Sequence, residues 1–362
     1  MIACILPSSI QANIDGAASP IYRDHNFVKL PLSFSFGVDT VASQVDHEPH
    51  LEGGGFAASK SKPRHRSSRM GLSWSAGAKF KVSVDWVSRI ITSKRDQFEL
   101  DSYTISFRHE LLSVNGPWSF SFGASISSNR ASDLTKTSYT NYDGLLVTRV
   151  SLNEPYDRQY QANLIARRLT SKGIGTAVYS GLGRVKSDNK GFDGVIQDDE
   201  QCRFGFASRD AGSAVQLLEP CGSIQSYRRV YPSSAAFEDQ YKINSSADVK
   251  SRTVYWQIGA QLSKLVGRHQ YGIGYHYQRF FRDAVDQRLE QRGMDPLLDN
   301  HSISTWWHYR LNTNWQLETG AEYSRRPMLN RLFLLYTGFT SERFRQDAIV
   351  FSATLRYRFG RI

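Results

Sequence analysis

The chain lacks any long hydrophobic run, and no stretch approaches the ~18 to 20 apolar residues of a membrane-spanning helix. Hydrophobic residues make up 40% of its 362 residues, and the mean hydropathy is −0.44. These values exclude a bundle of helices in a bilayer. They do not exclude a membrane-spanning sheet, because every second residue of such a strand can face a polar interior and keep the mean hydropathy low.

Cysteine is scarce, with three in the chain. Cys4 lies near the start, whereas Cys202 and Cys221 flank one long polar segment. Two cysteines this close in a cysteine-poor chain predict a disulfide formed in an oxidising compartment, and two free surface thiols are the alternative. No CxxC pair or metal-ligand spacing occurs, so we expect no metal and no cofactor.

Positive charge is in excess, with 45 Lys and Arg against 34 Asp and Glu and a formal net charge of +11. The cations form no compact block, and no zinc-ligand spacing or recognition-helix pattern accompanies them. We therefore do not expect nucleic acid as a partner. Anionic lipid headgroups or a small anionic solute fit a dispersed positive charge better.

Alternation of apolar and polar residues dominates the chain. The runs last about 9 to 12 residues, whereas strands of globular proteins average ~5 to 6. Tryptophan and tyrosine often stand near the ends of the apolar faces, as suits a membrane–water boundary. A soluble β-sandwich is the alternative. The clearest runs are 30–38, 72–86, 103–108, 118–126, 254–262, 271–278, 303–311, 315–323 and 349–359.

The links between these runs are of two kinds, very short or long and polar. The short ones carry turn residues and lie at 114–117, 170–173, 266–269 and 312–314. The long ones lie at 43–69, 127–143, 208–246, 281–301 and 324–346. Short turns on one side and long loops on the other are typical of bacterial membrane barrels.

The sequence therefore predicts an all-β fold, a transmembrane antiparallel up-and-down β-barrel over residues 27–362 with long extracellular loops. We expect about 14 strands, with 12 as the alternative. The higher number requires two strands within 65–93 and a weak one near 193–207. Residues 1–26 are expected to be a residual signal or leader and a periplasmic N-terminus, since Met1 to Leu6 form a short apolar run without a basic start.

The final run alternates through Leu355, Tyr357 and Phe359, and three residues, 360–362, follow it. It resembles the C-terminal strand of Gram-negative outer-membrane β-barrel proteins, porins among them, although that class usually stops at the final Phe. The resemblance implies a location in the bacterial outer membrane, surrounded by lipid and lipopolysaccharide. It also implies that these three residues are the signal that the barrel-assembly machinery recognises.

A second, fainter resemblance lies in Trp118–Ser132, which contains the string Ser128-Asn129-Arg130-Ala131-Ser132. This segment is similar to the first barrel segment of surface-lipoprotein assembly modifiers. The periplasmic repeat domain that usually precedes that barrel is missing from this sequence. The similarity implies, as an alternative function, an assembly or secretion barrel for surface lipoprotein or polysaccharide.

Charged residues fall on the polar side of the alternation and are predicted to face the lumen. In an open pore such residues select solutes by charge, and the excess of cations predicts a channel for small anionic solutes. The alternative is a mutually neutralised network that plugs a narrow barrel. The predicted lumen residues are Lys79, Lys81, Arg108, Arg149, Arg167, His276, His308, Arg310, Glu318, Glu322, Arg356 and Arg358.

No catalytic pattern stands out, and we do not expect an enzyme. The His-x-Ser-Asn-Gly string of outer-membrane phospholipases is absent, and residues 299–302 (Asp-Asn-His-Ser) are expected to be solvated loop residues. Four arginines at loop edges are instead predicted to contact lipopolysaccharide phosphates, because Arg binds phosphate through two hydrogen bonds. They are Arg279, Arg282, Arg325 and Arg326.

Overall fold

The computed structural model describes residues 32–45, 64–76, 79–92, 97–113, 118–136, 140–142, 145–197, 203–208, 215–219, 230–231, 248–291, 295–325, 333–337 and 347–359. Cys202, Cys221, Arg326 and the expected leader 1–26 lie outside these residues. The disulfide and the leader therefore stay predictions.

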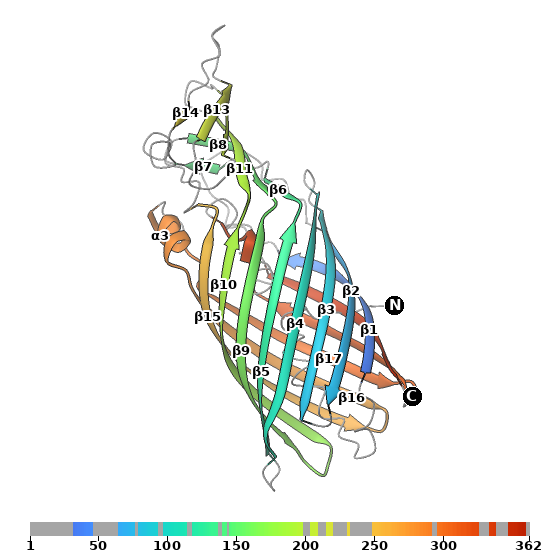
Figure 1. Ribbon diagram of the computed structural model, residues 1–362. Helices are drawn as coiled ribbons and strands as arrows, with labels where there is room; N and C mark the ends of the chain where they lie inside the picture. The colour runs from blue at the N-terminus through green and yellow to red at the C-terminus, as the bar shows by residue number, and fades with distance from the viewer. Residues whose placement is uncertain are drawn as a thin grey trace.

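Twelve strands of the described chain close into an antiparallel barrel (Figure 1). The first strand pairs with the last, with Ser33 opposite Arg358. This confirms the predicted all-β barrel, with the twelve-strand alternative in place of the expected fourteen. In order around the barrel the strands are β1 (Leu32–Val45), β19 (Asp347–Arg358), β18 (Trp315–Ser324), β17 (Asp299–Arg310), β16 (His269–Phe281), β15 (Ser251–Val266), β10 (Ile174–Asp188), β9 (Tyr156–Leu169), β5 (Trp118–Ala131), β4 (Gln97–Ser113), β3 (Phe80–Thr92) and β2 (Arg64–Ala76).

Seven shorter strands form a second sheet beyond one end of the barrel (Figure 1). They belong to the two connections that follow β5 and β10. The weak barrel strand expected near 193–207 is therefore wrong, because β11 pairs with β8 and β12 rather than with the wall. The two strands expected within 65–93 are confirmed as β2 and β3. The second sheet comprises β6 (Asp133–Lys136), β7 (Thr140–Tyr142), β8 (Leu145–Asn153), β11 (Gly191–Gln197), β12 (Arg203–Ser208), β13 (Val215–Glu219) and β14 (Val230–Tyr231).

The two ends of the barrel differ in their connections. Tight turns link the strands at one end, and Gly173 (φ 72°) and Gly267 (φ 58°) adopt left-handed conformations that suit a residue without a Cβ. The long connections leave the other end and include α3 (Asp283–Gln291) and η2 (Phe333–Leu335). In bacterial barrels the short turns face the periplasm and the long loops face outward.

No helix among the described residues is long and apolar enough to cross a membrane.

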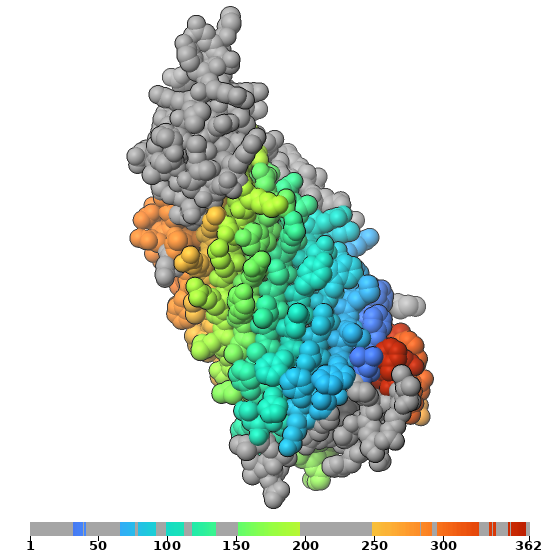
Figure 2. Space-filling model, in the orientation of Figure 1, coloured from blue at the N-terminus to red at the C-terminus, as the bar shows by residue number. Residues whose placement is uncertain are grey.

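The outward side chains of the wall form an apolar band. Figure 2 shows the outer face of the barrel over β10, β9, β5 and β4. Leu182 and Leu164 are 65% and 61% exposed, although both are aliphatic. An apolar surface of this extent is unfavourable in water and is matched by hydrocarbon. The chain therefore has the architecture of a bacterial outer-membrane protein. Further members of the band are Phe36, Val38, Leu72, Val84, Ile105, Phe120, Ile126, Val254, Leu262, Ile273 and Ile303.

Candidate functional site

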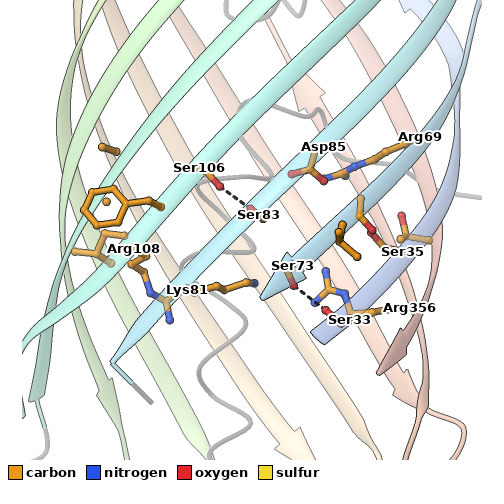
Figure 3. A pocket seen from close by; sticks show the side chains of 17 residues that line it. Ser33, Ser35, Arg69, Ser73, Lys81, Ser83, Asp85, Ser106, Arg108 and Arg356 are labelled. Atoms are coloured by element: carbon orange, nitrogen blue, oxygen red, sulfur yellow. Dashed lines mark hydrogen bonds and ion pairs between the residues drawn. The ribbon is translucent and has the colours of Figure 1, made fainter. Parts of the chain in front are cut away.

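A small cavity of about 50 Å³ lies inside the barrel, lined mainly by β1 to β5 and β19 (Figure 3). Its wall consists largely of small inward residues, which leave the interior unfilled at this point. Two hydroxyl pairs join neighbouring strands, Ser33 to Ser73 at 2.7 Å and Ser83 to Ser106 at 2.6 Å between the oxygens. We call this side of the interior the serine wall.

Of the residues that the structure describes, four cationic side chains and one carboxylate line the cavity. The cations are Arg69, Lys81, Arg108 and Arg356, and Figure 3 shows them arranged around the space. Arg69 donates to Asp85 at 3.3 Å from strand β2 to strand β3. Because water is limited inside a narrow barrel, charges act there more strongly than on a solvated surface. The described lining of the cavity therefore carries a net positive charge.

One further carboxylate approaches the cavity from β18. Glu318 Oε1 lies 3.1 Å from Arg356 Nη1, and Gln316 bonds both Glu318 and Arg358. The predicted neutralised network is thus present at this point, on β18 and β19. Among the described residues that line the cavity, four cations stand against one carboxylate, and Glu318 pairs with one of the four.

Of the other predicted lumen residues, two lie outside the barrel wall and the rest lie on its inner side. Two predictions are wrong. Arg149 belongs to β8, which pairs in the second sheet, and Lys79 is an exposed residue of the turn before β3. Both follow the alternation, but the wall does not extend to either position. Those buried on the inner side of the wall are Arg167, His276, His308, Glu318 and Glu322, while Arg310 and Arg358 lie on the inward side near the short turns.

The opposite side of the interior, formed by β10, β15, β16 and β17, carries large rings; we call it the aromatic wall. Each ring lies over a glycine that is its direct cross-strand partner: Tyr179 over Gly259, Tyr255 over Gly183 and Trp306 over Gly272. A Cβ on any of these glycines would come within 2.0 to 2.2 Å of ring carbon. The glycines therefore make room for the rings that fill this half of the lumen.

His276 belongs to the aromatic wall. Its Nδ1 lies 2.8 Å from the hydroxyl of Tyr179, and both residues are buried. A buried imidazole held by a hydrogen bond and by ring stacking positions its neighbours. It is not available to a solute in this arrangement.

The connection between β18 and β19 folds into the barrel at the end with the long connections. It does so through residues 333–337, which we call the cap. Phe333 stacks on Tyr255 with ring centroids 5.7 Å apart and meets Phe280 edge-on at 5.7 Å. The backbone N–H of Leu334 donates to Asp157 Oδ2 of the wall at 3.0 Å. Because these contacts join a loop to inward wall residues, the cap closes part of the lumen.

Tyr336 fixes the other side of the cap. Its hydroxyl donates to Asp286 Oδ1 and accepts from the N–H of Leu297, both at 3.1 Å. The guanidinium of Arg282 lies 4.0 Å from the centre of its ring and 3.3 Å from Asp286. Burial raises the pKa of Tyr336 to about 12 and raises that of Asp286. Tyr336, Asp286, Arg282 and the backbone of Leu297 therefore form one buried cluster.

A buried chain of hydrogen bonds links the cap to the serine wall. Arg89 donates to Ser102, Ser102 donates to Asn129, and Asn129 Nδ2 donates to Asp157 Oδ1 at 2.7 Å. Asp157 accepts from Leu334 in turn. Each member sits at an inward position of consecutive wall strands, β3, β4, β5 and β9. None of these residues was among the predicted lumen set, and all four lie outside the clearest alternating runs, with Asn129 in the expected loop 127–143.

The four arginines predicted to contact lipopolysaccharide do not form one group. Arg282 is 3% exposed and packs under the cap, so this assignment is wrong for it. Arg279 lies on the outer face, 3.9 Å from Asp299, and Arg325 is exposed after β18. Arg326 lies outside the described residues.

Leu355, Tyr357 and Phe359, the predicted assembly signal, lie on the outward side of the end of β19. Tyr357 contacts the ring of Trp315 at 4.7 Å and that of Phe359 at 5.0 Å between centroids. Their recognition by assembly machinery stays a prediction.

His301, within the predicted solvated segment, forms a hydrogen bond with the Tyr275 hydroxyl at 2.7 Å. No group of three metal-ligating side chains occurs within the described parts of the chain.

No family model matches the chain, and no curated protein sequence matches it. Among solved structures, it is similar to the translocator domain of autotransporter NalP from Neisseria meningitidis, with 10% identity, 97% of each chain covered and a TM-score of 0.49. It is also similar to an outer-membrane channel from Pseudomonas putida F1, with 11% identity, 91% of this chain and 96% of that one covered, and a TM-score of 0.44. For the KdgM porin the identity is 9%, the covered shares are 91% and 99%, and the TM-score is 0.37. Values this low carry no information about cargo.

Proposed function

We propose that the protein is an outer-membrane channel for small anionic solutes. The observation that carries the proposal is the cationic cavity. Arg69, Lys81, Arg108 and Arg356 converge on one space inside a closed barrel whose outside is apolar. Charged side chains that line a pore select permeating ions by sign.

The hydroxyl groups of the serine wall add a second property. They offer donors and acceptors that can replace part of a solute's hydration without holding it tightly. A conducting site must bind well enough to admit a solute and weakly enough to release it. Cations beside small hydroxyl residues offer a permeating anion both positive charge and hydrogen-bond donors.

The test is the reversal potential of the purified protein in a planar bilayer under a salt gradient. Lys81 and Arg108 face one another across β3 and β4, so we choose the double variant Lys81→Glu/Arg108→Glu. We expect the reversal potential to shift from anion toward cation preference. The matched control is Lys264→Glu, because Lys264 is exposed on the outside of β15, bonded to the Lys172 carbonyl.

Because the cap closes part of the lumen, the test includes a second background in which the cap is weakened. If the native protein conducts poorly, the same comparison is made in a Phe333→Ala background, in which the lumen is less obstructed. An unchanged reversal potential with conductance retained would contradict the proposal. A lack of conductance in both backgrounds would favour the alternative, an assembly or secretion barrel for surface lipoprotein or polysaccharide.

A further inference from the structure

The outer surface carries a group of cations that the channel proposal does not use. Arg158 on β9, Lys186 on β10 and Arg252 on β15 are direct cross-strand neighbours, and all three are exposed. Arg184 lies on the same side of β10, two residues nearer the short turns. We call these four residues the outer cationic patch.

Like charges in this arrangement are unfavourable. Cross-strand neighbours have Cα atoms about 4.5 to 5.5 Å apart, and like charges placed directly opposite destabilise a sheet. Lys186 is compensated by Asp188 at 3.1 Å, which Lys250 shares at 2.7 Å. Among the described residues, no carboxylate lies within ion-pair distance of the three arginines. The patch therefore has room for anions that the chain itself does not supply.

The position of the patch indicates what those anions are. The next outward residues toward the short turns are apolar and exposed: Tyr160 at 50%, Leu182 at 65% and Val254 at 49%. The strands of the patch, β9, β10 and β15, are neighbours in the wall and lie beneath the second sheet (Figure 1). The patch thus sits at the border of the apolar band, at the end with the long connections. In an outer membrane this is the headgroup level of the outer leaflet.

The geometry points to the outer cationic patch as a binding site for the phosphate groups of a bisphosphorylated glycolipid of the lipid A type. Arginine forms paired hydrogen bonds with phosphate, and three arginines on adjacent strands can engage more than one phosphate. The apolar side chains alongside match the acyl chains of the same molecule. A free anion would use the arginines but not this neighbouring apolar surface.

The experiment is a titration of the full-length protein, purified in detergent, with bisphosphorylated lipid A, read by native mass spectrometry. The test variant is Arg158→Gln/Arg184→Gln/Arg252→Gln, which keeps polar side chains of moderate length. The matched control is Arg168→Gln/Lys264→Gln. These two cations are exposed on the outside of β9 and β15, at the opposite end of the same strands. A heat-dependent gel shift in SDS verifies that each variant is folded.

We expect the affinity of the test variant to fall at least ~10-fold, which corresponds to 1.4 kcal/mol, while the control variant binds like the native protein. Dephosphorylated lipid A should bind the native protein as weakly as lipid A binds the test variant. The proposal is overturned if the test variant keeps native affinity or if the control variant loses as much. Binding of inorganic phosphate with the affinity of lipid A would also overturn it, since the site would then recognise a free anion. These outcomes do not depend on whether the barrel conducts.

Discussion

The two walls of the lumen follow the same alternation but differ in the size of their inward side chains. The serine wall of β1 to β5 and β19 leaves a cavity, whereas the aromatic wall of β10 and β15 to β17 fills the space that it faces. In the serine wall, Gly123 and Ser106 stand beside cations. In the aromatic wall, Gly183 and Gly259 are covered by tyrosine rings.

This difference shows that alternation determines which face a residue occupies but not whether the lumen is open. A glycine or serine opens space only when its cross-strand partner is also small. Ser33 opposite Ser73 leaves a void, but Gly259 opposite Tyr179 does not. The cap adds to the filled side, because Phe333 stacks on Tyr255 of the aromatic wall.

The largest effect should come from removing the cap. Phe333→Ala/Tyr336→Ala deletes both rings that hold residues 333–337 inside the barrel. Truncating a buried Phe typically costs about 3 to 5 kcal/mol, so the cap should lose its packed position. We expect a several-fold rise in single-channel conductance in planar bilayers.

Phe120→Ala is the control for the cap variant, because Phe120 is an exposed ring on the lipid-facing side of β5. It should leave the conductance at the native level. Equal conductance of the native protein and the cap variant would show that the cap does not limit passage and that the narrow point lies elsewhere.

A smaller effect is expected on stability, where the same substitution should destabilise the aromatic wall but not the serine wall. Gly259→Ala places a Cβ 2.2 Å from the Tyr179 ring, whereas Gly123→Ala meets at closest the Phe107 carbonyl at 3.7 Å. Overpacking typically costs about 1 to 3 kcal/mol, so Gly259→Ala should lower the free energy of unfolding by that amount. Gly123→Ala should change it by less than about 0.5 kcal/mol. Urea unfolding in lipid vesicles, followed by tryptophan fluorescence, measures both.

The glycine comparison has an internal check. If the clash with the ring is the cause, Tyr179→Ala should remove the penalty of Gly259→Ala in a double-mutant cycle. Additive losses would indicate that the glycine is required for its backbone and not for the space that it leaves.

Much of the barrel could be predicted from sequence because its main constraint is local. The cost of placing a cation in hydrocarbon fixes the register of each strand, so Lys81, Arg108 and Arg356 were correctly assigned to the inner face. The strand count was wrong because β8 and β11 alternate as wall strands do, yet pair with each other. Pairing partners are non-local, and alternation carries no information about them.

The cap and the role of Arg282 could not be predicted from periodicity, since both depend on a loop that folds back into the barrel. One signal was present. Residues 333–336 form the apolar run Phe-Leu-Leu-Tyr within the otherwise polar segment 324–346. Such a run in a connecting loop favours burial, and the rings of Tyr255 and Phe280 inside the barrel supply an apolar surface for it.

The smallest predicted effect is a pH dependence of the cap. Burial raises the pKa of the Asp286 carboxyl above its ordinary value of 3.8 while the cap is packed. A raised pKa means that the packed state binds the proton more tightly than the open state. The stabilisation is therefore fully present below the ordinary pKa and is lost as the pH rises through the raised pKa. We expect the open fraction of the channel to decrease as the pH falls from neutral toward 3.8. Asp286→Asn should abolish this part of the response, whereas Glu99→Gln, at an exposed position of β4, should retain it. A native protein whose open probability rises on acidification would show that another group controls the cap.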